Sequence, residues 1–511
     1  MLARLHSFAL TGLEAVPVEI EVDGGQGLPG LTIVGLPDQA VKEARERVRS
    51  AIRNSQFRFP DHRITVNLAP ADVKKEGGRF DLAIALGVLA SSDQLDPAAL
   101  REVIVVGELA LDGRLRSTPG MLPIVMAARG RQASSIVVPA ANASEACVVK
   151  DIAVVPVATL RQAVEHLAGT APIPVASNGS SKLTRRVNRY ALDFADVKGQ
   201  AVAKRALEIA VAGAHHVLLI GPPGSGKSML AQRLPTIQPD LTLDEALDTT
   251  AIHSVMGLLS DGQPLITQRP FRSPHHTSSA IALVGGGSNP RPGEVSLAHH
   301  GVLFLDELPE FHRDVLESLR QPLEDGCVRV ARAKRSVVFP SRFMLVAAMN
   351  PCQCGYFGDS RHRCRCTQAK VAAYLAKISG PLLDRIDLHI DVPAVPFQAL
   401  TQHGPDGESS ASIKRRVVKA RATQRRRLKP CGLFANSQMR HREIQKLCVM
   451  TDEAKRLLKS AMEALALSAR AYDKILKVAR TIADLTAEPT IQMDHLAEAI
   501  QYRSLDRQLW A

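Results

Sequence analysis

The sequence predicts an α/β protein built from three or so domains, and three observations carry this prediction. The chain has 511 residues, which is too many for a single hydrophobic core. Between residues 194 and 395, short apolar runs alternate with helical segments, as they do in a parallel sheet covered by helices. From residue 396 to residue 511 the pattern is helical.

Residues 1–170 form the first expected domain, an α+β or α/β unit with its own core. Apolar runs predict strands at 16–22, 31–37 and 64–68, and helical spacing predicts helices at 40–53 and 80–90. The Pro-, Gly- and Ser-rich stretch from Ala171 to Ser181 has no periodicity and predicts a linker. We therefore expect domains at 1–170, 194–395 and 396–511, with a linker at 171–193.

The overall charge points to a polyanionic partner. The net charge is +13, which favours nucleic acid first; a basic protein without such a partner is the alternative. Only 4% of the residues are aromatic, so base stacking is not expected to be the main contact. Residues 413–430 carry nine Lys or Arg and no acid, which indicates either a solvated helix face or a DNA contact.

Hydropathy and cysteine usage are typical of a cytoplasmic protein. No apolar run approaches the roughly 20 residues that cross a bilayer, and the N-terminus lacks the pattern of a secretory signal. We therefore expect a cytoplasmic location and no membrane partner. The eight cysteines argue against a disulfide framework in that compartment, although four of them cluster.

The segment from Gly221 to Ser228 fits G-x-x-x-x-G-K-[ST], the loop that wraps nucleotide phosphates. An apolar run at 217–220 precedes it as a buried strand, and a helix opens after it. Glycines let backbone N–H groups converge on phosphates, Lys227 can reach the β- and γ-phosphates of ATP, and Ser228 can bind Mg²⁺. The candidate nucleotide-binding residues are Gly221, Pro222, Pro223, Gly224, Ser225, Gly226, Lys227, Ser228 and Met229.

Two further apolar runs end in polar residues. Residues 302–305 lead into Asp306, expected to hold Mg²⁺, and Glu307, expected to act as general base toward the attacking water. The run at 343–349 ends in Asn350, which is expected to hold the attacking water or to sense the γ-phosphate. The alternative for Asn350 is an ordinary residue of a strand-terminal turn.

Two arginines are candidates for contacts with the transferring phosphoryl group. Arg385 lies in the motif 380–388 and, in a ring, can reach the nucleotide of a neighbouring subunit. Its alternative is an ion pair with Asp384 or Asp387. Arg470 follows a predicted helix start at Ser468 and is a candidate second phosphate contact; its alternative is a solvated helix residue.

Four clustered cysteines indicate a metal site within residues 352–366. Cys352 and Cys354 form one C-x-C pair, and Cys364 and Cys366 form a second. Four thiolates suit tetrahedral Zn²⁺ in a closed structural site. The alternatives are His362 in place of one ligand, an iron–sulfur cluster, or free thiols.

These elements together resemble the AAA+ ATPases and, more narrowly, the ComM/YifB family of magnesium-chelatase-like ATPases. The resemblance covers nearly the whole chain. Val197, Gly199 and Gln200 match the adenine-side entry segment of that family. Its most specific segments are Arg269–His276, Val284–Gly287, Pro292–Gly301 and Leu305–Phe311.

The resemblance implies an AAA+ P-loop ATPase core with a C-terminal helical lid and an N-terminal Lon-protease-like α+β domain. It also implies a homo-hexameric motor that drives branch migration of single-stranded and branched DNA in recombination during natural transformation, together with recombination proteins. Arg385 is then the trans arginine finger and Arg470 the second sensor. Residues 328–339 form a hairpin that places Lys334 and Arg335 against DNA phosphates; a basic surface hairpin is the alternative.

Two other functions remain as alternatives. One is an ATPase that remodels a protein complex, as the related chelatase subunits do. The other is a Lon-like protease, which uses a Ser–Lys pair. The matching turn, from Lys74 to Asp81, contains no serine, and Ser91 and Ser92 lie beyond the following helix. We therefore do not expect peptidase activity.

Overall fold

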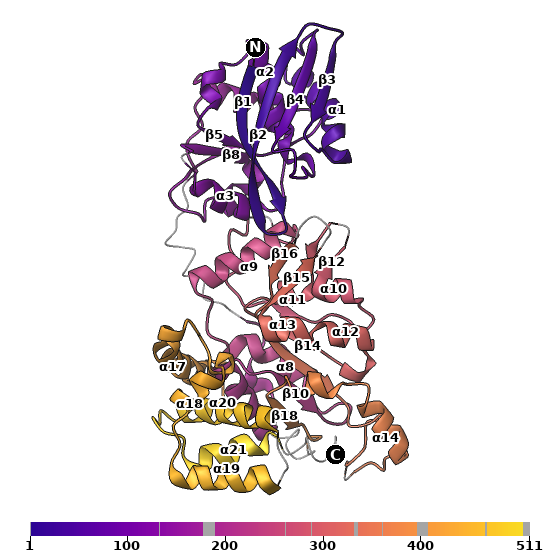
Figure 1. The fold of residues 1–511 in the computed structure, drawn as a ribbon, viewed down its shortest axis with the longest axis vertical. Coiled ribbons are helices and arrows are strands. Elements are labelled where there is room, and N and C mark those ends of the chain that lie inside the picture. Colours follow the sequence, from indigo (N-terminus) through magenta and orange to yellow (C-terminus); the bar gives the residue numbers. More distant parts are fainter. Residues whose placement is uncertain are drawn as a thin grey trace. The chain divides into compact units, whose positions relative to one another are not determined.

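The computed structural model describes residues 2–131, 133–176, 190–260, 262–287, 289–331, 336–359, 361–395, 407–464 and 468–503. The chain divides into two compact units, and Figure 1 labels their elements. The first unit comprises Met1–Val187, Leu243–Thr267 and Ala331–Val338. The second comprises Asn188–Thr242, Gln268–Val330 and Phe339–Ala511.

The first unit is built on a seven-stranded mixed sheet, with the order β3-β4-β2-β1-β5-β8-β9. The pairs β1–β2 and β2–β4 are antiparallel, and the other neighbours run parallel. A separate two-stranded sheet joins β6 (Glu108–Leu109) and β7 (Leu115–Arg116). The strands of the large sheet are β1 (Leu2–Thr11), β2 (Glu14–Gly25), β3 (Gly30–Val34), β4 (Arg63–Ala69), β5 (Val103–Val105), β8 (Ser135–Pro139) and β9 (Ala153–Val157).

Helices cover both faces of this sheet because alternate strand residues point to opposite sides. Val105 and Val137 join one apolar cluster, which contains α2, whereas Ile104 and Ile136 join another, which contains α3. Every residue of α2 is buried. The helices of the unit are α1 (Gln39–Asn54), α2 (Asp81–Ser91), α3 (Met121–Arg129), α4 (Ala143–Ala146), α5 (Leu160–Leu167) and α9 (Leu243–Val255).

Helix α9 is part of the first unit although it lies far along the chain, inside the range 194–395 that the sequence analysis gave to the second expected domain. It packs against α3, and the Gly120 N–H donates to the Ser254 carbonyl at 3.0 Å. The Ser254 hydroxyl also donates to the buried Glu145 carboxyl. Burial raises the pKa of Glu145, and hydrogen bonds from Ser254 and Leu122 oppose this.

The second unit contains a five-stranded sheet of order β11-β14-β17-β10-β18, and every pair in it is parallel. The sequence prediction of a parallel α/β core is therefore confirmed. Strands β10 and β14 begin and end where the apolar runs do, and the residues of β10, β14 and β17 are all buried. The strands are β11 (Phe271–Arg272), β14 (Val302–Leu305), β17 (Met344–Met349), β10 (Val217–Ile220) and β18 (Leu388–Asp391).

Short helices and two small sheets make up the rest of the described chain before residue 396, and in one of these sheets Ala331 and Ser336–Val338 are assigned to the first unit. The hairpin expected over residues 328–339 is present as the two-stranded sheet of β15 (Cys327–Ala331) and β16 (Ser336–Pro340). Lys334 and Arg335, predicted at its tip, lie outside the described residues. The second small sheet joins β12 (Gly285–Gly286) and β13 (Arg291–Pro292). The helices are α7 (Ala201–Gly213), α8 (Lys227–Ile237), α10 (Ala280–Val284), α11 (Glu294–Leu297), α12 (Arg313–Ser318), α13 (Arg320–Asp325), α14 (Gln368–Leu375) and α15 (Gly380–Leu383).

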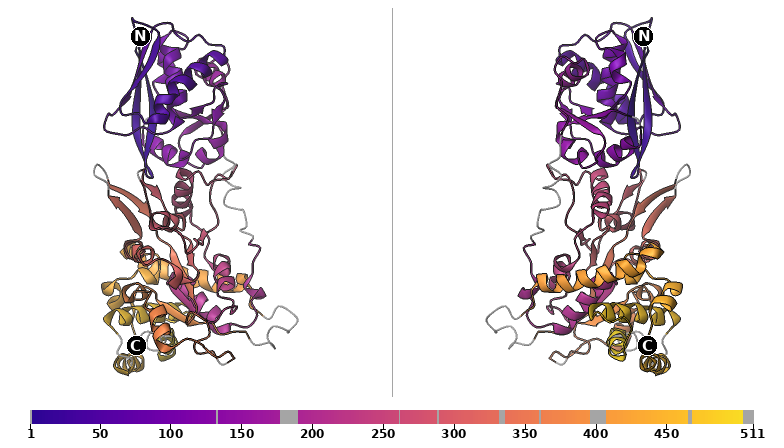
Figure 2. Two further views of the ribbon diagram at one scale, coloured as in Figure 1. Left: turned by 90° about the vertical axis from the view of Figure 1, so that its right-hand side faces the viewer. Right: turned by 90° about the vertical axis from the view of Figure 1, so that its left-hand side faces the viewer.

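The C-terminal part of the second unit is helical, as expected, and its helices gather beside the core (orange to yellow in Figure 2). Helix α20 packs against α7, α17 and α21. No helix in the described part of the chain is long and apolar enough to span a membrane. The C-terminal helices are α17 (Ser410–Leu428), α18 (His441–Leu447), α19 (Asp452–Ala464), α20 (Ala469–Leu485) and α21 (Met493–Gln501).

The basic segment 413–430 falls mostly on α17, where several of its cations bind groups of the same unit. Arg416 pairs with Glu208 and Glu408, and Arg427 pairs with the buried carboxylate of Asp484 at 2.6 Å. These contacts fix α17 against α7 and α20. They give part of the positive charge a structural role, which is neither a solvated helix face nor a DNA contact.

Candidate nucleotide site

The loop between β10 and α8 closes around its own lysine. Gly224 and Gly226 have φ values of +75° and +93°, which favour glycine, and Lys227 then opens the helix. The Lys227 Nζ donates to the carbonyl oxygens of Gly221 at 2.8 Å and Pro222 at 2.9 Å. Burial lowers the pKa of Lys227, and the charge of Asp306 opposes this. The ammonium therefore lies in the mouth of the loop, where a phosphate would replace the carbonyls as its partner.

The parallel register of three strands brings the predicted polar residues to one sheet edge. In β10 and β17, Ile220 pairs with Met349, and in β14 and β17, Leu305 pairs with Ala347. The residues that follow these strands therefore meet at the carboxyl edge of the sheet. The Lys227 Nζ lies 3.2 Å from the Asn350 Oδ1 and donates to it. Both residues were expected at the nucleotide site, Lys227 from the phosphate-loop motif and Asn350 from the strand that precedes it.

The Mg²⁺ candidates are in direct contact. The Ser228 Oγ donates to the Asp306 Oδ2 at 2.6 Å. A hydroxyl and a carboxylate in this arrangement are the oxygen ligands that Mg²⁺ takes beside a bound nucleoside triphosphate. The donor set of this chain therefore fits the metal.

Glu307 follows Asp306 in a left-handed conformation, with φ of +53°. Its side chain is 59% exposed and its Oε2 lies 3.5 Å from the His276 Nδ1. The sequence analysis did not connect His276 with the site. His276 lies in the segment Arg269–His276, which contains β11, but no spacing rule links a histidine after β11 to a carboxylate after β14.

The adenine-side candidates lie just before α7. Val197 is fully buried, and Gly199 and Gln200 both have positive φ, +62° and +54°. The Gln200 Nε2 donates to the Ser225 carbonyl at 3.1 Å and to the Pro393 carbonyl at 2.6 Å. This segment is thereby tied to the phosphate loop. Met229, the last of the predicted loop residues, packs against the main core of the unit.

The two candidate arginines bind acids away from the phosphate loop. The Arg385 guanidinium, whose side chain is 14% exposed, pairs with Glu324 and donates to the Pro381 carbonyl. The Arg470 Nη1 lies 3.5 Å from the Asp384 Oδ2. Among the described residues, neither guanidinium pairs with a phosphate-loop residue. The ion pair expected as the alternative for Arg385 forms with Glu324 rather than with Asp384 or Asp387.

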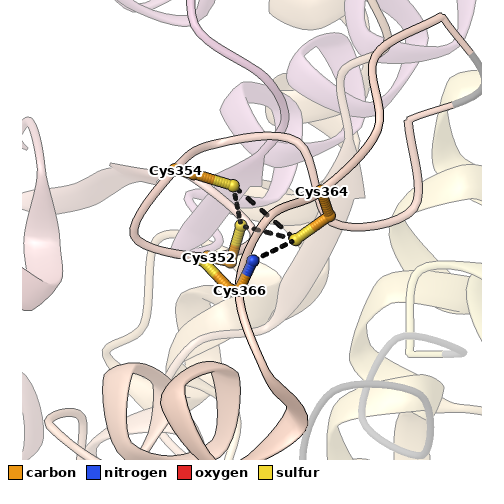
Figure 3. Close-up of side chains that lie close together, drawn as sticks. All are labelled: Cys352, Cys354, Cys364 and Cys366. Atoms are coloured by element: carbon orange, nitrogen blue, oxygen red, sulfur yellow. Dashed lines mark hydrogen bonds between the residues drawn. The ribbon is translucent and has the colours of Figure 1, made fainter.

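The four clustered cysteines converge (Figure 3). The Cys352 Sγ lies 3.3 Å from the Cys354 Sγ and 3.7 Å from the Cys364 Sγ, and the Cys354 and Cys364 sulfurs are 3.6 Å apart. All four Sγ atoms, including that of Cys366, lie within 4.8 Å of one another. Tetrahedral zinc with Zn–S bonds of about 2.3 Å holds its sulfurs about 3.8 Å apart. The spacing of the thiols therefore fits a zinc tetrathiolate site.

The thiol pKa values within the cluster shift in opposite directions: that of Cys354 is lowered, whereas those of Cys364 and Cys366 are raised. Backbone hydrogen bonds from Arg365 and Tyr356 lower the pKa of the Cys354 thiol to about 6. A metal ligand must be a thiolate. His362, the alternative ligand, instead stacks against Tyr356 with its ring centroid 4.8 Å away.

Comparison with known proteins now places the fold and site in a class. Residues 193–400 match the family model "Magnesium chelatase, subunit ChlI". Residues 20–142 match "Subunit ChlI of Mg-chelatase", and residues 407–503 match the corresponding C-terminal model. Together with the parallel sheet and phosphate loop, these matches define a magnesium-chelatase-type AAA+ protein.

Two full-length relatives narrow the class. The chain is 47% identical to competence protein ComM of Haemophilus influenzae over 99% of this chain and 98% of that protein. It is 46% identical to protein YifB of Salmonella typhimurium over the same shares of the two chains. The chain belongs to the ComM/YifB family of magnesium-chelatase-like proteins.

Two partial likenesses concern single regions. Lon protease 2 of Bacillus subtilis is 30% identical over 26% of this chain and 25% of that protein, which confirms the Lon-like part of the fold prediction. A probable DNA helicase, MCM8 of Arabidopsis thaliana, is 26% identical over 41% of this chain and 23% of that protein.

In the first unit, Lys75 of the Lon-like turn and the two serines at the end of the next helix bind backbone carbonyl groups. Lys75 is fully buried and its ammonium binds the Pro70 carbonyl. The hydroxyls of Ser91 and Ser92, the nearest serines in the sequence, donate to the Val88 carbonyl at 2.9 and 3.0 Å. These contacts hold the two serines against the end of their own helix.

Proposed function

We propose that this protein is an ATPase that binds MgATP between Lys227, Ser228, Asp306 and Asn350. The observation that carries the proposal is the convergence of these side chains at one sheet edge, through the Lys227–Asn350 and Ser228–Asp306 hydrogen bonds. When ATP enters, its phosphates take the place of the Gly221 and Pro222 carbonyls at the Lys227 ammonium. The backbone N–H groups of the loop and the start of α8 then bind the phosphate oxygens.

Hydrolysis needs a base and a means of holding water. Glu307 lies one residue beyond Asp306, and its exposed carboxylate accepts a proton from the attacking water. Asn350 orients that water or contacts the γ-phosphate. Ser228 and Asp306 would hold Mg²⁺, which would neutralise charge on the phosphates. Cys352, Cys354, Cys364 and Cys366 would hold zinc, which would stabilise the loop after Asn350.

We further propose that the ATPase is a homo-hexameric DNA motor that promotes branch migration in recombination and natural transformation. The full-length likeness to a competence protein, the partial likeness to a probable DNA helicase and the net charge of +13 support this proposal. Arg385 then serves the nucleotide of the neighbouring subunit, and Arg470 contacts the subunit's own nucleotide. Lys334 and Arg335 contact DNA phosphates independently of sequence.

The test combines assembly with stimulation of hydrolysis. Electron microscopy of the protein with ATP and four-way DNA is expected to show six-membered rings on DNA. ATP hydrolysis is expected to rise when single-stranded or branched DNA is added. A monomeric protein whose rate of ATP hydrolysis does not change with DNA contradicts the DNA motor. The absence of any ATP hydrolysis contradicts the ATPase proposal.

A double substitution tests the proposed DNA contact. Changing Lys334 and Arg335 together to Glu is expected to abolish DNA stimulation and leave DNA-free hydrolysis intact, because the charges that meet the phosphates are reversed. The matched control reverses Lys455 and Arg456 on α19, an exposed basic pair where Lys455 contacts only a neighbouring acid in the described structure. Equal DNA stimulation in both variants argues against a DNA-binding hairpin.

A second candidate is an ATPase that remodels a protein complex, which the three magnesium chelatase matches favour. Comparing stimulation of hydrolysis by DNA with stimulation by candidate protein partners separates the two functions. Stimulation by a protein and none by DNA selects the second.

A further inference from the structure

The four-cysteine segment, residues 352–366, follows Asn350 closely, and the helix after it lies close to Asn350 again. Cys352 lies two residues beyond Asn350, and the chain from Cys352 to Cys366 gathers its four sulfurs (Figure 3). Thr367 then caps α14 by accepting a hydrogen bond from the Lys370 N–H. Near the end of that helix, burial raises the pKa of Tyr374, and a hydrogen bond from the Asn350 backbone opposes the rise. The Tyr374 hydroxyl therefore lies next to the backbone of Asn350.

The same segment rests on the phosphate loop. The Gly355 N–H donates to the Cys352 carbonyl at 2.9 Å, which closes a tight turn between the first two cysteines. A Cβ on Gly355 would lie 2.6 Å from the Pro223 Cδ and 2.7 Å from its Cγ. Gly355 is therefore glycine for two reasons: its φ of +89° and the proline ring against it.

A third contact reaches the segment that follows Glu307. Lys377, just beyond α14, has its Nζ 3.3 Å from the Glu310 Oε2. The cysteine segment and its helix therefore touch the phosphate loop, the Asn350 backbone and the chain after the general base. The phosphate loop and Asn350 carry part of the proposed ATP chemistry.

The described part of the segment is otherwise anchored by Arg361, whose guanidinium donates to the Ala394 and Val395 carbonyls. Between Gln353 and Gln368, among the described residues, only Gly355 is buried. A loop with so few buried groups loses the entropy of ordering without a compensating core, and a metal held by four thiolates supplies the missing stabilisation.

We propose that this four-cysteine segment is a positioning element of the nucleotide site, so that zinc occupancy controls ATP binding and turnover by fixing Pro223 and Asn350. The inference rests on the proposed ATPase function and adds regulation of the same site. Loss of the metal releases the turn at Gly355 and the Asn350 backbone together. The Lys227 ammonium then loses its fixed amide partner.

Two glycine variants test the contact with the phosphate loop. Gly355→Ala introduces both backbone strain and a clash with Pro223, whereas Gly358→Ala introduces strain alone, because φ is +80° and nothing lies within 4 Å of its Cβ. Affinity for a fluorescent ATP analogue, zinc content and hydrolysis are measured for both full-length variants. We expect Gly355→Ala to keep zinc and to lose nucleotide affinity at least tenfold, and Gly358→Ala to match the wild type. Wild-type affinity in Gly355→Ala, or equal losses in both variants, overturns the inference.

Metal removal tests the control by zinc. The full-length protein is treated with a zinc-selective chelator, and nucleotide affinity is measured with Mg²⁺ present before and after zinc is restored. We expect affinity to fall at least tenfold and to recover with zinc. Cys364→Ser is expected to reproduce the loss without chelator, whereas Cys431→Ser, which changes an exposed cysteine outside the cluster, leaves both zinc and affinity unchanged.

Lys227→Ala separates failure of this inference from failure of the ATPase proposal. If Lys227→Ala binds nucleotide as the wild type does, the proposed ATP site is wrong, and the inference falls with it. If Lys227→Ala fails to bind while the zinc-free wild type binds normally, the ATP site stands and only the control by zinc is overturned.

Discussion

The Ser228 hydroxyl donates a hydrogen bond of 2.6 Å to the Asp306 carboxylate, 78 residues farther along the chain. Ser228 lies in the first turn of α8, and Asp306 follows β14, which is separated from β10 by β17. The contact exists because parallel strands end at the same edge of the sheet. It brings together the two oxygen groups that we propose as Mg²⁺ ligands.

Lys227→Ala is expected to weaken MgATP binding by roughly tenfold to a hundredfold, the value of one or two hydrogen bonds to a charged group, and to abolish turnover. Nucleotide titration and phosphate release measure both effects. The control is Lys414→Ala, which removes a lysine that pairs with Asp240 at 2.7 Å on another face of the unit. Wild-type hydrolysis in Lys227→Ala would show that the loop does not serve ATP.

Glu307→Gln is expected to bind ATP normally and to slow hydrolysis by about 10²–10⁴, because the amide cannot accept the proton of the attacking water. Single-turnover hydrolysis beside equilibrium binding separates the two effects. Glu310→Gln is the matched control, since that carboxylate binds Lys377. Unimpaired hydrolysis in Glu307→Gln would mean that another group is the base.

Arg385 and its partner Glu324 distinguish an arginine finger from a structural ion pair. Arg385→Ala is expected to keep nucleotide binding and to lose roughly 10³-fold in hydrolysis, because charge on the transferring phosphoryl group is no longer neutralised. Glu324→Ala removes the same ion pair and leaves the guanidinium in place, so its hydrolysis is expected to be near wild type. Equal losses in the two variants would assign Arg385 a structural role.

Mixing tests whether the finger acts in trans. Arg385→Ala subunits combined with Lys227→Ala subunits are expected to recover part of the hydrolysis that each lacks alone. Recovery requires an intact phosphate loop in one subunit and an intact arginine in its neighbour. A mixture as inactive as its components would indicate that Arg385 does not act between subunits.

Asp387 is expected to be critical for the stability of the second unit. Although burial favours the neutral carboxyl, the Lys474 ammonium 3.1 Å away holds the pKa of Asp387 well below its ordinary value. Asp387 also accepts from the His216 N–H at 3.1 Å. Asp387→Ala removes the acceptor of the His216 N–H and leaves the buried Lys474 ammonium with the Ile386 carbonyl but no countercharge, which should cost about 3–5 kcal/mol.

Thermal unfolding measures this loss, with Asp384→Ala as the control. Asp384 forms its ion pair with Arg470, whose side chain is 71% exposed, and such pairs contribute at most about 1 kcal/mol. A much lower melting temperature for Asp387→Ala than for Asp384→Ala is expected. Similar melting temperatures would show that the buried pair is not important to the unit.

Some elements escaped prediction for identifiable reasons. Strand β1 was not expected, because Arg4 and His6 interrupt its apolar residues, although Ala3, Leu5 and Ala9 alternate toward one face. Helix α9 lies within the expected range 194–395 but belongs to the first unit. A helical segment in the sequence does not show which unit buries it.

By itself, the sequence determined the phosphate loop, the strands that lead into Asp306 and Asn350, the clustering of four cysteines in two C-x-C pairs, and the α/β class. These features follow from local rules: glycine where φ is positive, apolar runs for buried strands and fixed spacing for ligands. Only the tertiary structure decided that His276 meets Glu307, that Arg385 pairs with Glu324 and that Gly355 lies against Pro223. Each of these contacts joins segments whose separation is set by the packing of the whole unit, and no local pattern encodes that separation.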